Sequence, residues 1–141
     1  MIPARVVAID YGQRRVGIAV ADPLRLFAQS HGTYDPERAL EVLQKIYNQE
    51  GIETALIGWP LTLDGKEGEA TERVAAYIDR LKLVLPGVEI VKWDERFTSE
   101  RAKEIIRESG ARKKARRDKA RVDAAAASIM LQEYLDEHSG R

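Results

Sequence analysis

Three carboxylates in this sequence stand where they could hold a metal ion together. Asp10 ends the apolar run RVVAID, and Glu95 follows the apolar run VEIVKW. The carboxyl ends of strands are where functional sites gather in α/β sheets. Asp123 precedes the apolar stretch AAAASIML, in which positions 123, 126, 127, 130 and 134 fall on one stripe of a helix. We therefore expect Asp10, Glu95 and Asp123 to meet at one edge of a sheet.

A site made only of carboxylates suits a hard cation. Mg²⁺ or Mn²⁺ takes oxygen ligands, keeps several waters and completes its shell with a substrate phosphate. Two such ions can activate a water and stabilise the leaving oxygen during phosphodiester hydrolysis. The chain has no cysteine, and His31 and His138 are expected to have ordinary surface roles. G-x-S-x-G, P-loop and HExxH patterns are absent from the sequence.

Each of the three carboxylates could instead have a purely structural role. Asp10 could cap a tight turn, and Glu95 could pair with Arg96 beside a helix N-terminus. Asp123 could be an acid in the first turn of a helix, where it favours the helix macrodipole. Asp94 competes with Glu95 for the same role. The sequence leaves these alternatives open.

The elements that must position these residues follow from periodicity and from turn residues. Strands are expected at 4–10, 16–22 and, more weakly, 26–34, with Gly12 and Gly17 bracketing a tight hairpin turn. Asp35-Pro36-Glu37 predicts the start of a helix that runs to Gly51. A strand at 53–60, a helix ending at Pro86-Gly87, a strand at 88–93 and helices at 98–109 and 122–137 follow. This order predicts an α/β fold: a mixed five-stranded sheet, antiparallel in its first three strands and then alternating with helices on both faces.

Composition predicts one soluble globular domain over residues 1–141. Hydrophobic residues make up 44% of the chain and charged residues 33%. The longest apolar run is too short to cross a bilayer, and the N-terminus lacks the layout of a signal peptide. We therefore expect a cytoplasmic protein without membrane contact.

A basic segment stands out against a net charge of zero. Residues 112–121, RKKARRDKAR, hold seven Lys or Arg and one Asp. A concentrated basic segment on an otherwise acidic chain is a candidate for binding a polyanion. The alternative interpretation is a solvated linker.

Four segments resemble the YqgF (RuvX) family: IDYGQRRVGIAVAD, LIGWPLTLDGKEG, WDERFTSERA and VDAAAASIMLQEYL. The resemblance implies an RNase H-like fold, and it assigns the acids of three family motifs to Asp10, Glu95 and Asp123. Family members are described as nucleases that process the 5′ end of pre-16S rRNA and as Holliday junction resolvases. Trp59 departs from the small aliphatic residue usual between Gly and Pro in the second segment. It could stack on a base or pack in the protein.

The leading hypothesis is a Mg²⁺- or Mn²⁺-dependent endonuclease that acts on structured RNA, at the 5′ end of the small-subunit rRNA precursor. Gly12 would let a phosphate approach the hairpin backbone. Flanking phosphates would be held by Arg96, Lys113, Lys114, Arg116 and Arg117. The protein is expected to be a monomer or a weak homodimer.

Three other functions remain possible from the sequence. A Holliday junction resolvase would share the site and differ in its substrate. A non-catalytic, rRNA-binding assembly factor would keep the acids without turnover. An actin-like ATPase would use the Asp-Gly hairpin to cradle phosphates, but such proteins need two domains around the nucleotide.

Overall fold

Five strands form one mixed sheet in the computed structural model, which describes residues 4–94 and 115–138, with 115–124 described through their backbone. The strands lie in the order β3-β2-β1-β4-β5. β1, β2 and β3 are antiparallel neighbours, and β4 and β5 run parallel to β1. Their bounds are Arg5–Tyr11, Val16–Ala21, Ala28–Tyr34, Ile52–Trp59 and Glu89–Asp94, in numerical order. The predicted mixed five-stranded sheet is confirmed.

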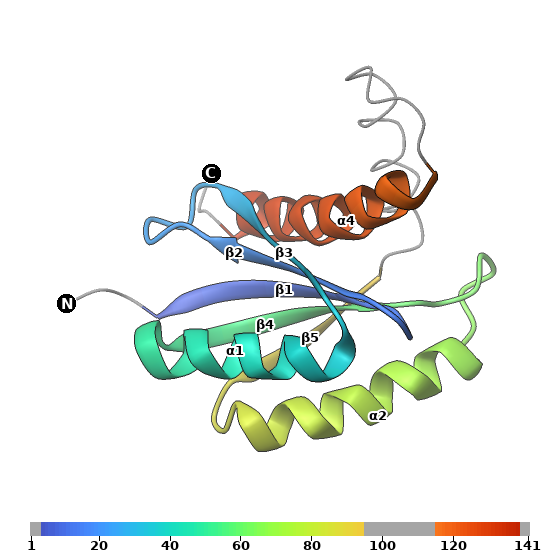
Figure 1. The fold of residues 1–141 in the computed structure, drawn as a ribbon, viewed down its shortest axis with the longest axis horizontal. Helices are drawn as coiled ribbons and strands as arrows, with labels where there is room; N and C mark the ends of the chain where they lie inside the picture. Colours follow the sequence, from blue (N-terminus) through green and yellow to red (C-terminus); the bar gives the residue numbers. More distant parts are fainter. Residues whose placement is uncertain (1–3, 95–114, 139–141) are drawn as a thin grey trace.

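Helices cover both faces of the sheet, as predicted (Figure 1). α1 (Pro36–Glu50) and α2 (Glu69–Val84) pack on one face, and α4 (Ala115–Glu137) packs on the other. The alternation of a strand divides the core accordingly. Val7 and Ile9 of β1 join the cluster under α1 and α2, whereas Val6 and Ala8 join the cluster under α4. The helix predicted at 98–109 lies outside the described residues.

The ends of α1 show that its sequence signals act as expected. The Asp35 side chain accepts a hydrogen bond from the backbone N–H of Arg38 at 2.9 Å, which caps the helix N-terminus. Gly51 ends the helix with φ of +79°, a conformation that glycine adopts without steric cost. The chain then enters β4, where Ile52 pairs with Arg5 of β1.

The predicted start of the last helix is wrong. The helix begins at Ala115 rather than near Val122. Residues 115–121 therefore belong to the helix, and their interpretation as a linker is wrong. Ala, Lys and Arg are strong helix formers, so the basic run extends the helix instead of interrupting it. Asp123 consequently lies two turns inside α4, where the macrodipole no longer acts, so its interpretation as a first-turn acid is also wrong.

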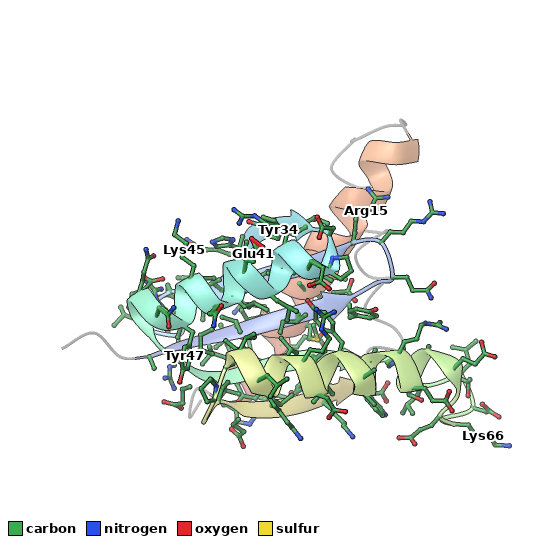
Figure 2. The ribbon with its side chains drawn as sticks, turned by 60° about the horizontal axis from the view of Figure 1, so that its bottom comes forward. Arg15, Tyr34, Glu41, Lys45, Tyr47 and Lys66 are labelled. Atoms are coloured by element: carbon green, nitrogen blue, oxygen red, sulfur yellow. The ribbon has the colours of Figure 1, made fainter. Side chains whose placement is uncertain are left out.

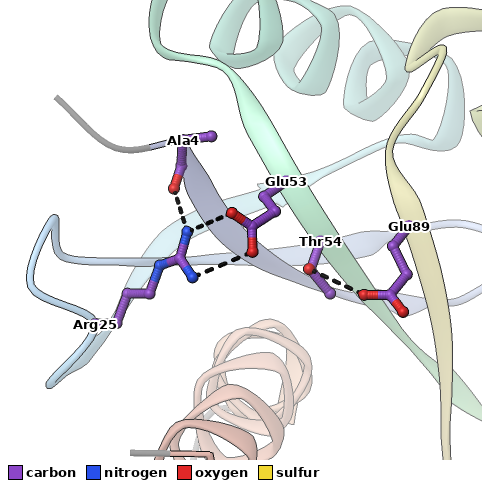
Figure 3. Close-up of polar contacts among 5 residues, drawn as sticks. All are labelled: Ala4, Arg25, Glu53, Thr54 and Glu89. Carbon is purple, nitrogen blue, oxygen red and sulfur yellow. Dashed lines mark hydrogen bonds and ion pairs between the residues drawn. The ribbon is translucent and has the colours of Figure 1, made fainter. Parts of the chain in front are cut away.

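Side chains that pair with one another lie at the end of the sheet opposite to Asp10 (Figure 3). The Arg25 guanidinium donates to the backbone oxygen of Ala4 at 2.9 Å and to the Glu53 carboxylate at 3.0 Å. This guanidinium lowers the pKa of Glu53. At the same end, the Asp22 carboxylate accepts backbone hydrogen bonds from the loop before β3, which lower its pKa. At this end of the sheet, the side chains of Arg25, Glu53 and Asp22 therefore all make hydrogen bonds within the protein.

In the described ranges, no helix is long and apolar enough to span a membrane.

Candidate active site

Asp10 lies on the α4 face of the sheet, near the end of β1. The side chains of Val6 and Ala8 are buried on that face, and the two-residue period of the strand adds Asp10 to them. Asp10 is half-buried.

Glycines stand beside Asp10 on both neighbouring strands. Asp10 pairs directly with Gly17 of β2. Ile9 pairs with Ile57, which places Gly58 of β4 on the other side of Asp10. Adjacent strands are only about 4.8 Å apart, so side chains at these two positions would crowd the carboxylate. Both glycines are buried, and neither adds a side chain beside Asp10 on the α4 face.

The helix that carries Asp123 crosses the same face. Ala127, Met130 and Leu131 of α4 are buried against Ala8 of β1 and against residues of the neighbouring strands. Asp123 lies one turn before Ala127 in this helix. The backbone thus puts Asp10 and the Asp123 helix on one side of the sheet, as the carboxylate hypothesis requires.

The structure describes only some of the other predicted site residues. Glu95, Arg96, Lys113 and Lys114 lie outside the described residues. Two more predicted phosphate ligands, Arg116 and Arg117, belong to the first turn of α4.

Asp94 is the alternative to Glu95 as a member of the site. Asp94 ends β5, and by strand alternation it belongs to the face of the sheet opposite to that of Asp10. Ile90 packs in the cluster under α1 and α2, whereas Val91 and Trp93 pack in the cluster under α4. Strand alternation adds Asp94 to the face of Ile90. Because β5 is an edge strand, Asp94 also borders a cavity beside Trp93 and the last turns of α4. The choice between Asp94 and Glu95 stays a prediction, because Glu95 lies outside the described residues.

The geometry of the hairpin turn explains why position 12 is a glycine. Its backbone N–H donates to the carbonyl oxygen of Arg15 at 2.9 Å, which closes the turn between β1 and β2. A Cβ atom at Gly12 would lie 2.7 Å from that oxygen. The turn thus requires a glycine there, and the approach of a phosphate to Gly12 stays a prediction.

Trp59 packs in the protein. It is half-buried against the core under α1 and α2. Its indole nitrogen donates to Glu67 at 3.1 Å, and the Lys92 ammonium lies 4.1 Å from its ring centroid. These contacts favour packing over base stacking as its role.

The histidines make local contacts. His31 shares a hydrogen bond with the hydroxyl of Tyr34, and the ring of His138 stacks on Tyr134. Within the part of the chain that the structure describes, no three His, Cys, Asp or Glu side chains gather closely enough to bind a metal. Two members of the predicted acidic site, Glu95 and the Asp123 side chain, fall outside that part.

Comparison of the sequence with known proteins finds a matching family and similar relatives. The RuvX family, described as "Holliday junction resolvase", matches residues 4–137. A Salinibacter ruber protein named "Putative pre-16S rRNA nuclease" is 56% identical over 133 residues, which cover 94% of this chain and 93% of that protein. A protein of the same name from Chlorobaculum tepidum is 41% identical over 135 residues, with 96% and 95% covered.

A solved structure shares the fold. RuvC of T. thermophilus, in complex with a Holliday junction substrate, superimposes with a TM-score of 0.58 at 16% identity, over 98% of this chain and 97% of that one. This likeness concerns the fold, which is the RNase H-like architecture expected from the sequence. The match over nearly the whole chain and the high identity to the curated relatives show that the protein belongs to the RuvX family.

Proposed function

We propose that the protein is a divalent-metal-dependent endonuclease that processes the 5′ end of pre-16S rRNA during ribosome biogenesis. The observation that carries this proposal is the placement of Asp10: it stands on the face covered by the Asp123 helix, with Gly17 on one side and Gly58 on the other. The names of the relatives from Salinibacter ruber and Chlorobaculum tepidum support this choice of substrate.

The residues present fit a hard divalent cation. Gly17 and Gly58 add no side chain beside the Asp10 carboxylate, which suits an ion that retains waters and meets a phosphate oxygen. Asp10, Glu95 and Asp123 would hold Mg²⁺ or Mn²⁺ through carboxylate oxygens, which these ions prefer. When bound, the metal would act as a Lewis acid on the phosphate and lower the pKa of the attacking water.

The protein contributes positioning to this chemistry. β1 is paired on both sides, so the backbone of Asp10 is held in a central strand. α4 is anchored on the same face by buried side chains of its C-terminal half, and its N-terminal half, which carries Asp123, continues the same helix. Held in this way, the carboxylates would meet the substrate phosphate with little reorganisation.

The start of α4 supports a role for the basic segment in substrate binding. Arg116 stands seven positions before Asp123 in one continuous helix, which corresponds to about 10 Å along the axis. Arg116 and Arg117, with Arg96, Lys113 and Lys114, would hold phosphates that flank the cleaved bond. Binding through these cations should depend steeply on salt concentration.

A second candidate function uses the same residues on another substrate. The family description names a Holliday junction resolvase, which would cleave branched DNA with the same carboxylates. The two candidates differ in the nucleic acid that the surface around the site accepts.

One assay tests the proposal against this rival. The purified protein is incubated with an RNA fragment that spans the 5′ end of pre-16S rRNA and, separately, with a four-way DNA junction. We expect the RNA to be cut in Mg²⁺ or Mn²⁺, cleavage to stop in excess chelator, and activity to return when metal is restored. Cleavage of the junction alone would favour the resolvase, and RNA binding without cleavage in either metal would favour an assembly factor.

A further inference from the structure

We propose that Arg14, at the tip of the β1–β2 hairpin, binds a backbone phosphate of the nucleic acid beside the cleaved bond. This inference rests on the proposed function, and it adds a contact that neither the sequence motifs nor the basic segment indicated.

Arg14 differs from the other arginines whose side chains the structure describes. Each of five is ion-paired with a glutamate: Arg5 with Glu50, Arg25 with Glu53, Arg38 with Glu41, Arg73 with Glu69 and Arg80 with Glu37. Arg15 also has an interaction partner. Among these seven, Arg14 is the one with neither an ion pair nor a hydrogen bond to another residue of the described ranges, and it is exposed. Its charge is available to a ligand.

The hairpin presents Arg14 from a defined place. Asp10 pairs with Gly17 and Tyr11 with Val16, so the strands are in register up to the turn. The hydrogen bond from Gly12 to Arg15 then closes the turn directly beyond Tyr11. Arg14 thus stands on a tight turn that begins two residues after Asp10. Figure 2 shows the neighbouring Arg15 at this end of the molecule, well away from Lys45 on α1.

A guanidinium in this position suits a phosphodiester. Arginine presents its donors in a planar fork that matches two phosphate oxygens, and it stays charged at every physiological pH. Binding by Arg14 would not require an existing ion pair to be broken, as it would for the five paired arginines. A nucleic acid held at Asp10 would pass the hairpin tip, because Arg14 and the carboxylate belong to the same end of β1.

Substitution of Arg14 tests the inference through the salt dependence of binding. Affinity for the pre-16S RNA fragment is measured in chelator, where no cleavage occurs, over a range of salt concentrations. We expect Arg14→Gln to reduce the slope of log K against log salt by about one and to weaken binding about fivefold near 0.1 M salt. In the cleavage assay, KM should rise by a similar factor while kcat stays nearly constant.

Two variants serve as controls. Lys45→Gln removes one exposed positive charge from α1 and should leave both slope and affinity unchanged. Arg14→Lys keeps the charge and should restore the slope. Melting temperatures should agree among all variants, because the altered side chains are exposed.

The outcomes separate this inference from the proposed function. Wild-type cleavage together with an Arg14→Gln variant that binds like wild type would overturn the role of Arg14 and leave the nuclease proposal standing. An equal loss in Lys45→Gln would reduce the effect to general charge and would also overturn it. A wild-type protein that neither binds nor cuts the RNA would contradict both.

Discussion

Replacement of Asp10 by Asn is expected to lower kcat for RNA cleavage about a thousandfold while the fold is retained. Asn has nearly the same shape, but its neutral amide is a poor ligand for a hard cation. A thousandfold loss corresponds to about 4 kcal/mol of transition-state stabilisation, in line with the several kcal/mol that a metal Lewis acid supplies. The measurement is single-turnover cleavage of the RNA fragment at saturating protein, with the melting temperature recorded alongside.

Two other Asp→Asn substitutions make this result specific. Asp79 is exposed on α2, on the far side of the sheet, and Asp79→Asn should leave kcat unchanged. Asp94→Asn should also retain activity, because strand alternation puts Asp94 on the face of Ile90. Loss of activity in Asp94→Asn at undiminished stability would reverse the choice of Glu95 over Asp94. Full activity in Asp10→Asn would remove Asp10 from the site.

Truncation of Leu131 should cause a large loss of stability. This side chain is completely buried where α4 packs on the sheet. Leu131→Ala leaves a cavity, and we expect it to lower the free energy of unfolding by about 3 kcal/mol, with a fall of roughly 10 °C in Tm. Denaturant and thermal unfolding measure these quantities. Because α4 also carries Asp123, the same packing supports the candidate site.

Leu83→Ala provides the matched control for Leu131→Ala. It deletes the same atoms from a leucine on α2 that is 83% exposed, so the change in unfolding free energy should stay within about 0.5 kcal/mol. If Leu131→Ala and Leu83→Ala had equal effects, α4 would not be packed on the sheet in the way described.

Local signals predicted the elements well. Gly12 opens the hairpin turn and Asp35-Pro36 begins α1, because both features depend on neighbours in the sequence, whereas Gly17, expected to bracket the turn, lies inside β2. The start of α4 was missed for a physical reason. A run of Lys, Arg and Ala has strong helix propensity, but it lacks the side chains that cap a helix, and its charge resembles that of a linker.

The surroundings of Asp10 depend on contacts that are distant in sequence. Gly58 and Asp10 become neighbours only through the register between β4 and β1, which no local pattern reveals. A glycine inside an apolar strand run was the one signal available, since it often marks a close approach. The available charge of Arg14 was likewise hidden, because it depends on which glutamates the fold brings to the other arginines.

The most direct test of the carboxylate site is anomalous diffraction at the manganese edge from crystals grown with Mn²⁺. The proposed site predicts an anomalous peak within about 2.1 Å of carboxylate oxygens from Asp10, Glu95 and Asp123, with the ion on the face of the sheet that carries Asp10. The peak should vanish in crystals of Asp10→Asn. A well-ordered site without manganese, or manganese bound elsewhere while Asp10 makes other contacts, would contradict the account.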